Sequence, residues 1–198
     1  MKHHLSSRIA FLIVALLVTR VRANAEEHRF FLAMQSGCGL LSWERSVKHY
    51  NRGLDLQMKG DLDGAIAEYR MSITQCSTFW RPSYNLGTAL EAKGDFDGAI
   101  EEYHKVISEW PEIFQAHYAL GYDLEAKGDL NAAIAEYRRA IRGRNKYPEA
   151  HYHLGHALQA KGDLDGAIAE YRTAIRQRSN YPEAQSAIEE ALKAKGKS

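Results

Sequence analysis

The sequence is poor in the residues that interrupt helices or cross-link chains. Only 4 of its 198 residues are proline and only 2 are cysteine. Long helices are therefore allowed, because an interior proline costs a helix about 3 kcal/mol. Two cysteines are too few for the disulfide framework of a small secreted scaffold. The formal net charge is only +1, so the chain lacks the basic excess of nucleic-acid-binding proteins and we predict no nucleic-acid partner.

Motifs of familiar enzyme classes are missing as well. The sequence contains no HExxH, CxxC, GxSxG or GxGxxG segment, which would indicate metalloprotease, redox, hydrolase or dinucleotide chemistry. The ending Gly196-Lys197-Ser198 resembles the end of a phosphate-binding loop, but Ala191 stands where that loop needs its leading glycine. We therefore predict that the protein is not an enzyme and has no catalytic residues, no cofactor and no metal.

Residues 1–25 have the order of a secretory signal. Lys2 and Arg8 give a positive start and precede an apolar run at 9–18. A cleavage pattern of small residues ends at Ala25. This run would rise only about 15 Å as a helix, which is too short to cross a bilayer. We predict export to a bacterial periplasm or beyond, and a mature chain without a membrane span. An uncleaved anchor or a buried helix is the alternative.

Export bears on the two cysteines. In an oxidising compartment a disulfide between Cys38 and Cys76 is chemically feasible, and it would tie the segment before the repeats to the end of the first repeat. Two free, buried thiols are the alternative. The sequence fixes no distance between the two side chains, so both interpretations stay open.

A repeat with a period of 34 residues dominates the rest of the chain. Four segments are near copies of one another: KGDLDGAIAEYR (59–70), KGDFDGAIEEYH (93–104), KGDLNAAIAEYR (127–138) and KGDLDGAIAEYR (161–172). Self-similarity at a fixed interval is typical of a solenoid, in which each unit buries its apolar face against its neighbours.

Each repeat has the pattern of two helices. In the last complete unit, apolar and small residues recur at helical spacing on both sides of the corner Lys161-Gly162-Asp163. Gly162 suits the left-handed conformation that ends a helix, and Asp163 suits the N-cap of the next one. So short a connection predicts that the two helices pack antiparallel.

Glycines within the first helix of the repeats indicate close packing. Gly87, Gly121 and Gly155 lie inside predicted first helices, where glycine costs roughly 1 kcal/mol relative to alanine. We expect this cost to be tolerated because two helix backbones approach closely there. Small residues of the second helices stand at the matching positions: Ala65, Ala99, Ala133 and Ala167.

These columns resemble the tetratricopeptide repeat (TPR) family. The family pattern places Leu-Gly in the first helix and, in the second, an alanine followed four residues later by an aromatic residue. The matches are Leu86-Gly87, Leu120-Gly121, Leu154-Gly155, the four alanines, and Tyr69, Tyr103, Tyr137 and Tyr171. At the family's tryptophan position the chain departs from the pattern, with His49, Ser83, His117 and His151.

The resemblance implies an all-α fold, a right-handed α-solenoid of four helix-turn-helix units. The units would span 46–79, 80–113, 114–147 and 148–181. Residues 182–198 would form a C-terminal capping helix with an apolar stripe at Ile188, Ala191 and Leu192. Residues 26–45 lie outside the repeat and are interpreted as an N-terminal cap; a partner-binding or dimerising segment is the alternative.

The resemblance also implies a concave groove, lined by the first helices, that holds a peptide or a partner helix. Tyrosine recurs there every 34 residues, and it suits recognition because it offers a large rigid ring and a hydroxyl. The predicted groove residues are Tyr50, Asn51, Tyr84, Asn85, Tyr118, Tyr122, Tyr152, His153 and His156. The alternative is that the tyrosines only pack between adjacent first helices.

Some TPR domains grip a C-terminal carboxylate with Lys, Arg and Asn side chains. The equivalent columns here hold Tyr50, Leu54, Asn85, Gln115 and Ala119. Of these only Asn85 suits that task, so we predict no carboxylate clamp and a more aromatic surface for the ligand.

Two further clusters carry weaker signals. His151, His153 and His156 lie close in sequence, but two neutral histidines without a nearby carboxylate make a poor metal site, so polar groove residues are the preferred interpretation. Basic residues gather near the ends of two second helices, where they suit the negative end of the helix dipole. They are Arg138, Arg139, Arg142, Arg144, Arg172, Arg176 and Arg178, and an anion-binding patch is the alternative.

The sequence therefore predicts an exported adaptor or scaffold that binds a protein or peptide partner through a tyrosine-lined groove. The alternative is a structural, self-associating protein of the cell envelope. It would use residues 26–45 or one end of the solenoid.

Overall fold

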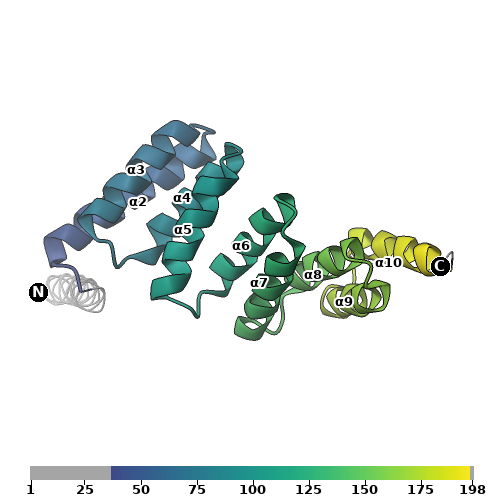
Figure 1. Cartoon of the computed structure of the whole chain (residues 1–198). Helices are drawn as coiled ribbons and strands as arrows, with labels where there is room; N and C mark the ends of the chain where they lie inside the picture. Colours follow the sequence, from purple (N-terminus) through teal and green to yellow (C-terminus); the bar gives the residue numbers. More distant parts are fainter. Residues whose placement is uncertain (1–36, 197–198) are drawn as a thin grey trace, which may run out of the picture.

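A computed structural model describes residues 37–196 (Figure 1). The predicted signal at 1–25 and the segment 26–36 lie outside the described residues. Over 37–196 the chain forms nine α-helices and no strand, as the repeat predicts. The helices are α2 (Leu40–Met58), α3 (Leu62–Gln75), α4 (Trp80–Ala92), α5 (Phe96–Glu109), α6 (Phe114–Ala126), α7 (Leu130–Gly143), α8 (Pro148–Ala160), α9 (Leu164–Gln177) and α10 (Pro182–Lys195).

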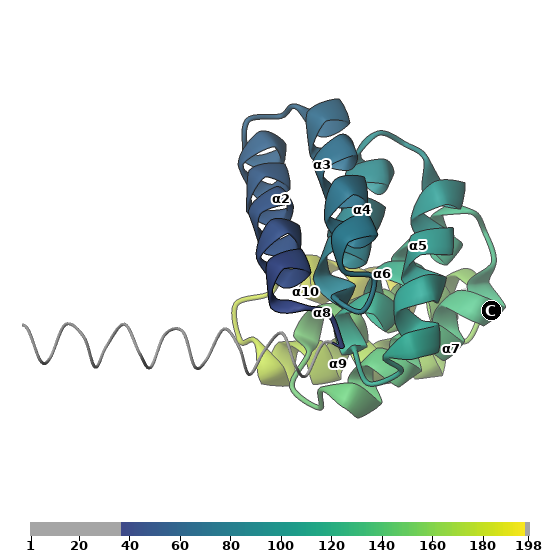
Figure 2. The same cartoon turned by 90° about the vertical axis from the view of Figure 1, so that its left-hand side faces the viewer.

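The helices stack in chain order. Each packs against the next, from α2 on α3 to α9 on α10, and the successive pairs wind into a curved array (Figures 1 and 2). The helix α4 also contacts α6, α6 contacts α8, and α8 contacts α10, whereas no comparable contact joins successive second helices among the described residues. The first helix of each pair therefore lies on the inner side of the curve.

The corner within each pair confirms the predicted turn chemistry. Its glycine has a φ between 80° and 86°, in the left-handed region that only glycine adopts without strain. The aspartate that follows accepts a hydrogen bond from the backbone amide three residues on, as Asp163 does from Gly166 at 2.9 Å. That bond satisfies an amide at the helix start, which has no partner within the helix.

The glycines inside the first helices make room mainly for tyrosine rings. A Cβ atom at Gly87 would lie 2.6 Å from Cε1 of Tyr103, and one at Gly121 would lie 2.8 Å from the ring of Tyr137. At Gly155 a backbone also comes close, since the carbonyl oxygen of Ala167 would lie 3.2 Å away. The second helix therefore does approach these glycines closely, but it does so mainly with a tyrosine side chain and less with its backbone. The four second-helix tyrosines are all fully buried: Tyr69, Tyr103, Tyr137 and Tyr171.

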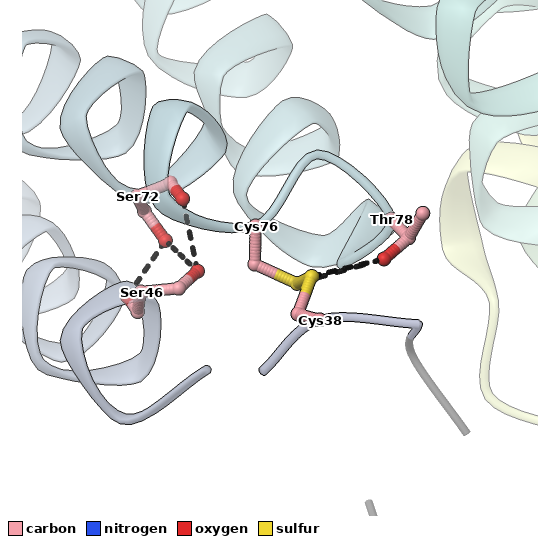
Figure 3. Close-up of a disulfide and its surroundings, with 5 residues drawn as sticks. All are labelled: Cys38, Ser46, Ser72, Cys76 and Thr78. Carbon is pink, nitrogen blue, oxygen red and sulfur yellow. Dashed lines mark hydrogen bonds between the residues drawn. A yellow bond between two sulfur atoms is a disulfide. The ribbon is translucent and has the colours of Figure 1, made fainter. Parts of the chain in front are cut away.

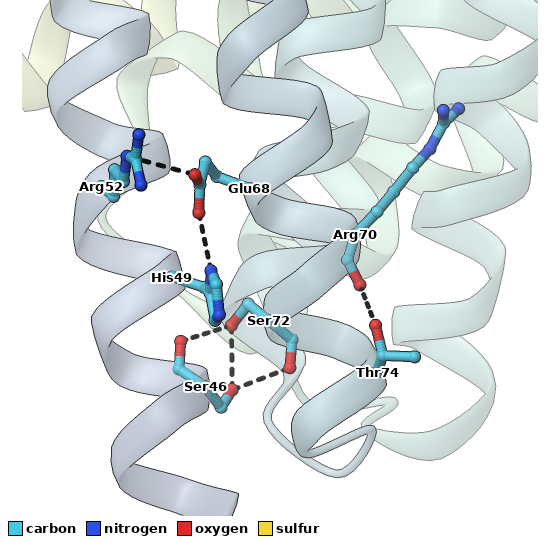
Figure 4. A network of polar contacts seen from close by, with 7 residues as sticks. All are labelled: Ser46, His49, Arg52, Glu68, Arg70, Ser72 and Thr74. Atoms are coloured by element: carbon cyan, nitrogen blue, oxygen red, sulfur yellow. Dashed lines mark hydrogen bonds and ion pairs between the residues drawn. The ribbon is translucent and has the colours of Figure 1, made fainter.

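Histidines at the family's tryptophan position bridge the two helices of a pair. The Nδ1 atom of His49 lies 2.7 Å from a carboxylate oxygen of Glu68 (Figure 4). His117 makes the same contact with Glu136, also at 2.7 Å. A polar bridge thus replaces the apolar ring that the family pattern would place there. In the first pair a second bridge joins buried hydroxyls, those of Ser46 and Ser72, at 2.8 Å.

The described part of the N-terminal segment belongs to the first helix pair. The helix α2 begins at Leu40 and not at residue 46, the predicted start of the first unit. Trp43 packs against Phe79 with ring centroids 4.9 Å apart. Of the two interpretations of the cysteines, the structure contains the disulfide: Cys38 and Cys76 are bonded, with Cα atoms 5.8 Å apart (Figure 3). The bond joins the start of α2 to the end of α3.

The last helix packs against α9 through small residues. Ala184, Ala187 and Ala191 are its buried positions. The predicted stripe is correct at Ala191, but Leu192 is 48% exposed. Ile188 is partly buried and packs against the core as predicted, so only Leu192 of the three predicted residues turns outward.

Candidate functional site

Three hollows follow one another along the inner side of the array. The surface that holds them, formed by α2, α4, α6 and α8, is termed the inner face. The hollows have volumes of about 250, 230 and 290 Å³. Thr88 borders both the first and the second, and Tyr122 borders both the second and the third. The three hollows therefore form one continuous run across the first helices.

The first hollow lies between α2 and α4 and has no charged residue at its border. It is bordered by Leu54, Gln57, Met58, Asn85 and Thr88. The side-chain amide of Gln57 on α2 reaches across to α4, where it donates a hydrogen bond to the hydroxyl of Thr88 at 3.4 Å. Met58 is 79% exposed, so an apolar side chain stands at the rim.

The second hollow lies between α4 and α6 and is built from aromatic rings and one carboxylate. Its border consists of Tyr84, Thr88, Glu91, Tyr118, Ala119 and Tyr122. Burial raises the pKa of Glu91, and the hydrogen bond that the Tyr103 hydroxyl donates to it, at 3.2 Å, opposes this rise. The hollow thus combines three tyrosines with a partly buried acid and no basic residue.

The third hollow lies between α6 and α8 and contains an acid with several donors. Its border consists of Tyr122, Glu125, Ala126, Tyr152, His153 and His156. The Tyr137 hydroxyl donates to Glu125 at 2.6 Å, and His156 contacts the same carboxylate. Burial pushes the pKa of Glu125 upward, but these bonds and that from His153 outweigh it and hold the pKa at about 2. Glu125 in turn raises the pKa of His156.

The tyrosines of the inner face are half-buried and rest on the second helices. The ring of Tyr84 lies 5.7 Å from that of Tyr103, and Tyr118 lies 6.0 Å from Tyr137. Tyr152 repeats the contact with Tyr171 at 5.7 Å. Tyr118 and Tyr152 also pack against rings at the start of the next first helix, those of Tyr147 at 5.0 Å and Tyr181 at 5.3 Å. The tyrosines therefore pack both within their own pair and against the next one, and they still border the second and third hollows.

Most of the predicted groove residues meet at the three hollows. Seven of the nine border them: Tyr84, Asn85, Tyr118, Tyr122, Tyr152, His153 and His156. The other two do not. Asn51 is exposed elsewhere on α2, and Tyr50 packs edge-on against Phe79 while its hydroxyl accepts from Asn85 at 3.3 Å.

A column of amide and carboxylate side chains on the first helices was missed by the sequence interpretation. Each member accepts a hydrogen bond from the second-helix tyrosine of its own pair, and the members are Gln57, Glu91, Glu125 and Gln159. The sequence carries a signal for it, because each member precedes its tyrosine by the same interval. The column fixes the tyrosine hydroxyls and places acids at the centre of the inner face and amides at its ends.

Asp123 on α6 is a second functional candidate that the sequence interpretation missed. It is fully buried, at a position where the neighbouring repeats have Ala89 and Ala157. Neither carboxylate oxygen has a hydrogen-bond partner among the described residues. Burial, and then the charge of Glu91, raise the pKa of Asp123 to about 7. The available signal was the difference from Ala89 and Ala157, the equivalent residues of the two flanking repeats.

The predicted histidine cluster divides in two. His151 contacts Glu170 at 2.7 Å, on the side away from the inner face, whereas His153 and His156 share Glu125. The expectation that these two histidines lack a nearby carboxylate is therefore wrong. Over residues 37–196, no group of three or more His, Cys, Asp or Glu side chains could hold a metal ion.

Several of the clustered arginines have partners within the array. Arg139 pairs with Glu136, Arg178 pairs with Glu149, and the guanidinium of Arg144 lies 5.4 Å from the ring centre of Phe114. Arg139 also borders an outer hollow of about 720 Å³, next to α5, α6 and α7.

No helix within 37–196 has the length and hydropathy that crossing a bilayer requires.

Comparison with known proteins identifies related repeats. A family model described as TPR repeat matches residues 124–162 and 160–196, and one described as Tetratricopeptide repeat matches 83–112. A crystal structure of MamA protein is 28% identical with a TM-score of 0.73, covering 77% of this chain and 84% of that one. No curated protein sequence matches the chain.

Two further solved structures share the fold at lower identity. The first is YrrB, described as a TPR protein with an unusual peptide-binding site; it is 20% identical with a TM-score of 0.67, and the match covers 76% of this chain and 78% of that one. The second is the first TPR of Spaghetti (RPAP3) bound to an HSP90 peptide, 19% identical with a TM-score of 0.57, covering 58% and 90%.

Proposed function

Because the chain belongs to the tetratricopeptide repeat family, we propose that it is an exported adaptor that binds a protein partner through its inner face. The observation that carries the proposal is the continuous run of three hollows, of which the second and the third are bordered by tyrosine rings. Exposed aromatic rings held on a rigid wall are typical anchors for a partner. The adaptor role involves no catalytic step.

The form of the inner face favours an extended peptide segment as the bound part of the partner. The hollows are small and follow one another, so a segment that runs along the inner face can place a side chain in each. YrrB and Spaghetti, which share the fold, are both described with a peptide. No lysine or arginine borders any of the three hollows, and this supports the prediction that the inner face is not a carboxylate clamp.

Two observations support export. Residues 1–25 have the order of a secretory signal, and the disulfide between Cys38 and Cys76 is of the kind that persists in oxidising compartments. Both favour a periplasm or the outside of the cell as the location of the adaptor.

Peptide selection tests the adaptor role. The mature chain, residues 26–198, is used to select binders from a library of displayed random octapeptides, and synthetic copies are measured by fluorescence anisotropy. Tyr122 is 41% exposed and borders two hollows, so Tyr122→Ala is expected to weaken binding about tenfold. Met71→Ala is the matched control, since Met71 is similarly exposed, at 47%, on the second helix α3. Equal binding by wild type and Tyr122→Ala would rule out the inner face as the surface that binds the peptide.

Self-association is a second candidate, supported by apolar side chains at both ends of the array. Leu41 on α2 is 69% exposed and Leu192 on α10 is 48% exposed. An open solenoid end can stack on another copy, because each unit buries its face only against a neighbour. Light scattering on the mature chain decides between the two: a dimer that dissociates in Leu41→Glu supports self-assembly, and a monomer supports the adaptor.

A further inference from the structure

The second hollow has three tyrosine side chains and one acid at its border. Rings from Tyr84, Tyr118 and Tyr122 border it together with Glu91. The face of an aromatic ring carries negative partial charge and attracts cations. Its volume, about 230 Å³, falls below the roughly 300–1,000 Å³ typical of pockets for small-molecule ligands. One long side chain suits this space better than a whole metabolite.

The negative charge at this hollow has no counterpart within the described chain. Glu91 accepts a hydrogen bond from the neutral Tyr103 hydroxyl and takes part in no ion pair among the described residues. Asp123 is buried next to it without a hydrogen-bond partner, and the charge of Glu91 raises the pKa of Asp123. Glu91 thus disfavours the ionisation of Asp123, and a cation in the hollow would oppose this effect.

The neighbouring hollows differ in this respect. The first has no charged residue at its border. In the third, His153 and His156 already contact the carboxylate of Glu125. Uncompensated acid and aromatic rings therefore coincide only at the second of the three inner hollows.

We propose that the second hollow receives the ammonium or guanidinium group of a lysine or arginine side chain of the bound peptide. The inference rests on the proposed function and specifies the chemistry of the partner: an extended segment with a basic residue between apolar ones. The cation would lie against the tyrosine faces, and Glu91 would accept a charge-assisted hydrogen bond from it.

The chain supplies its own control for the charge of Glu91. The equivalent residues in the first and fourth pairs are glutamines, and Gln57 and Gln159 accept from Tyr69 at 2.7 Å and from Tyr171 at 3.0 Å. Glu91→Gln therefore keeps an acceptor for the Tyr103 hydroxyl and removes only the charge. Glu101→Gln, at an exposed position of α5, removes the same charge away from the inner face.

The test uses the octapeptides selected with the mature chain. Selected peptides are expected to be enriched in lysine and arginine. Each basic residue is then replaced by norleucine, which keeps an unbranched aliphatic stem and removes the charged group, in synthetic peptides with blocked ends. The replacement should weaken binding to wild type and to Glu101→Gln about tenfold. It should weaken binding to Glu91→Gln clearly less, because only the attraction between the tyrosine rings and the cation is then lost.

The outcomes separate the inference from the function on which it rests. Peptides without a basic preference that still lose affinity for Tyr122→Ala overturn the cation inference and leave the adaptor role intact. A norleucine effect that is equally large in Glu91→Gln also overturns the inference. Failure to select any peptide, or selection of peptides that bind Tyr122→Ala as well as wild type, overturns both.

Discussion

The junction between the α4–α5 pair and the α6–α7 pair differs from its neighbours in one buried residue. Asp123 there takes the position that Ala89 and Ala157 hold at the flanking junctions, and all three are fully buried. The core also divides nearby, with Leu120 in one cluster of buried residues and Ala133 in the next. Near-identical repeats therefore give near-identical helices but unequal junctions, because the residues that meet across a junction are not all copied.

The largest change in stability is expected when a buried acid is introduced at another junction. We expect Ala157→Asp to lower the free energy of unfolding by about 3 kcal/mol at pH 8, since it buries a charge without a partner. Urea titration followed by circular dichroism measures the loss. Ala160→Asp, at an exposed position of the same helix, should change stability by less than about 0.5 kcal/mol. Equal losses in the two variants would mean that burial at this column is not decisive.

Removing the acid should make the central junction like its neighbours. Asp123→Ala is expected to stabilise the protein by roughly 1–3 kcal/mol at pH 8, because it deletes a buried carboxylate that lacks hydrogen bonds. The same urea titration applies. Asp55→Ala is the matched control, because Asp55 occupies the same column in the first pair but is exposed. A loss of stability in Asp123→Ala would show that the carboxylate has a stabilising partner.

The pH dependence of stability gives a smaller and more specific signal. The pKa of Asp123 in the folded chain is about 7, above the usual value near 3.9 of an unfolded chain. The folded state therefore binds the proton more tightly, and stability falls as pH rises through 7. Between pH 6 and pH 8 wild type should lose about 1 kcal/mol more than Asp123→Ala. Glu125 raises the pKa of His156, and the difference between the two proteins removes any contribution from this histidine. Parallel curves would contradict the assignment.

The corners should show the smallest and most uniform effect. Asp129 and Asp163 cap equivalent helices. Their carboxylate oxygens accept hydrogen bonds from backbone amides at 3.1 and 2.9 Å. Each change to alanine should cost about 1 kcal/mol, in the third and the fourth pair alike. Thermal unfolding of the two variants measures this. Clearly unequal costs would show that the corners, like the junctions, depend on their neighbours.

The copied features of the fold could be predicted from the sequence. The interval between repeats, the left-handed glycines and the capping aspartates follow from local backbone chemistry, and Gly162 and Asp163 behave as their residue types require. Seven of the nine groove residues also meet at the hollows, because helical spacing fixes which side chains share a face.

What could not be predicted depends on contacts between helices. The ring of Tyr103 fills the space beside Gly87, and Tyr50 packs against Phe79 and is not among the residues that border the hollows. The burial of Asp123 likewise depends on how α6 lies against α5. Periodicity gives the face of a helix, but the neighbour that the face meets is set by the rotation and tilt of the adjacent helix.

The disulfide makes the two ends of the array mechanically different. The bond between Cys38 and Cys76 closes the α2–α3 pair into a covalent loop, whereas α10 is held on α9 by small alanine side chains. A solenoid unravels from its ends, because each pair is supported only by its neighbours. When the two termini are pulled apart, we therefore expect the helices to unfold in order from α10 toward the disulfide-bonded α2–α3 pair. A reducing agent should abolish this preference for the C-terminal end.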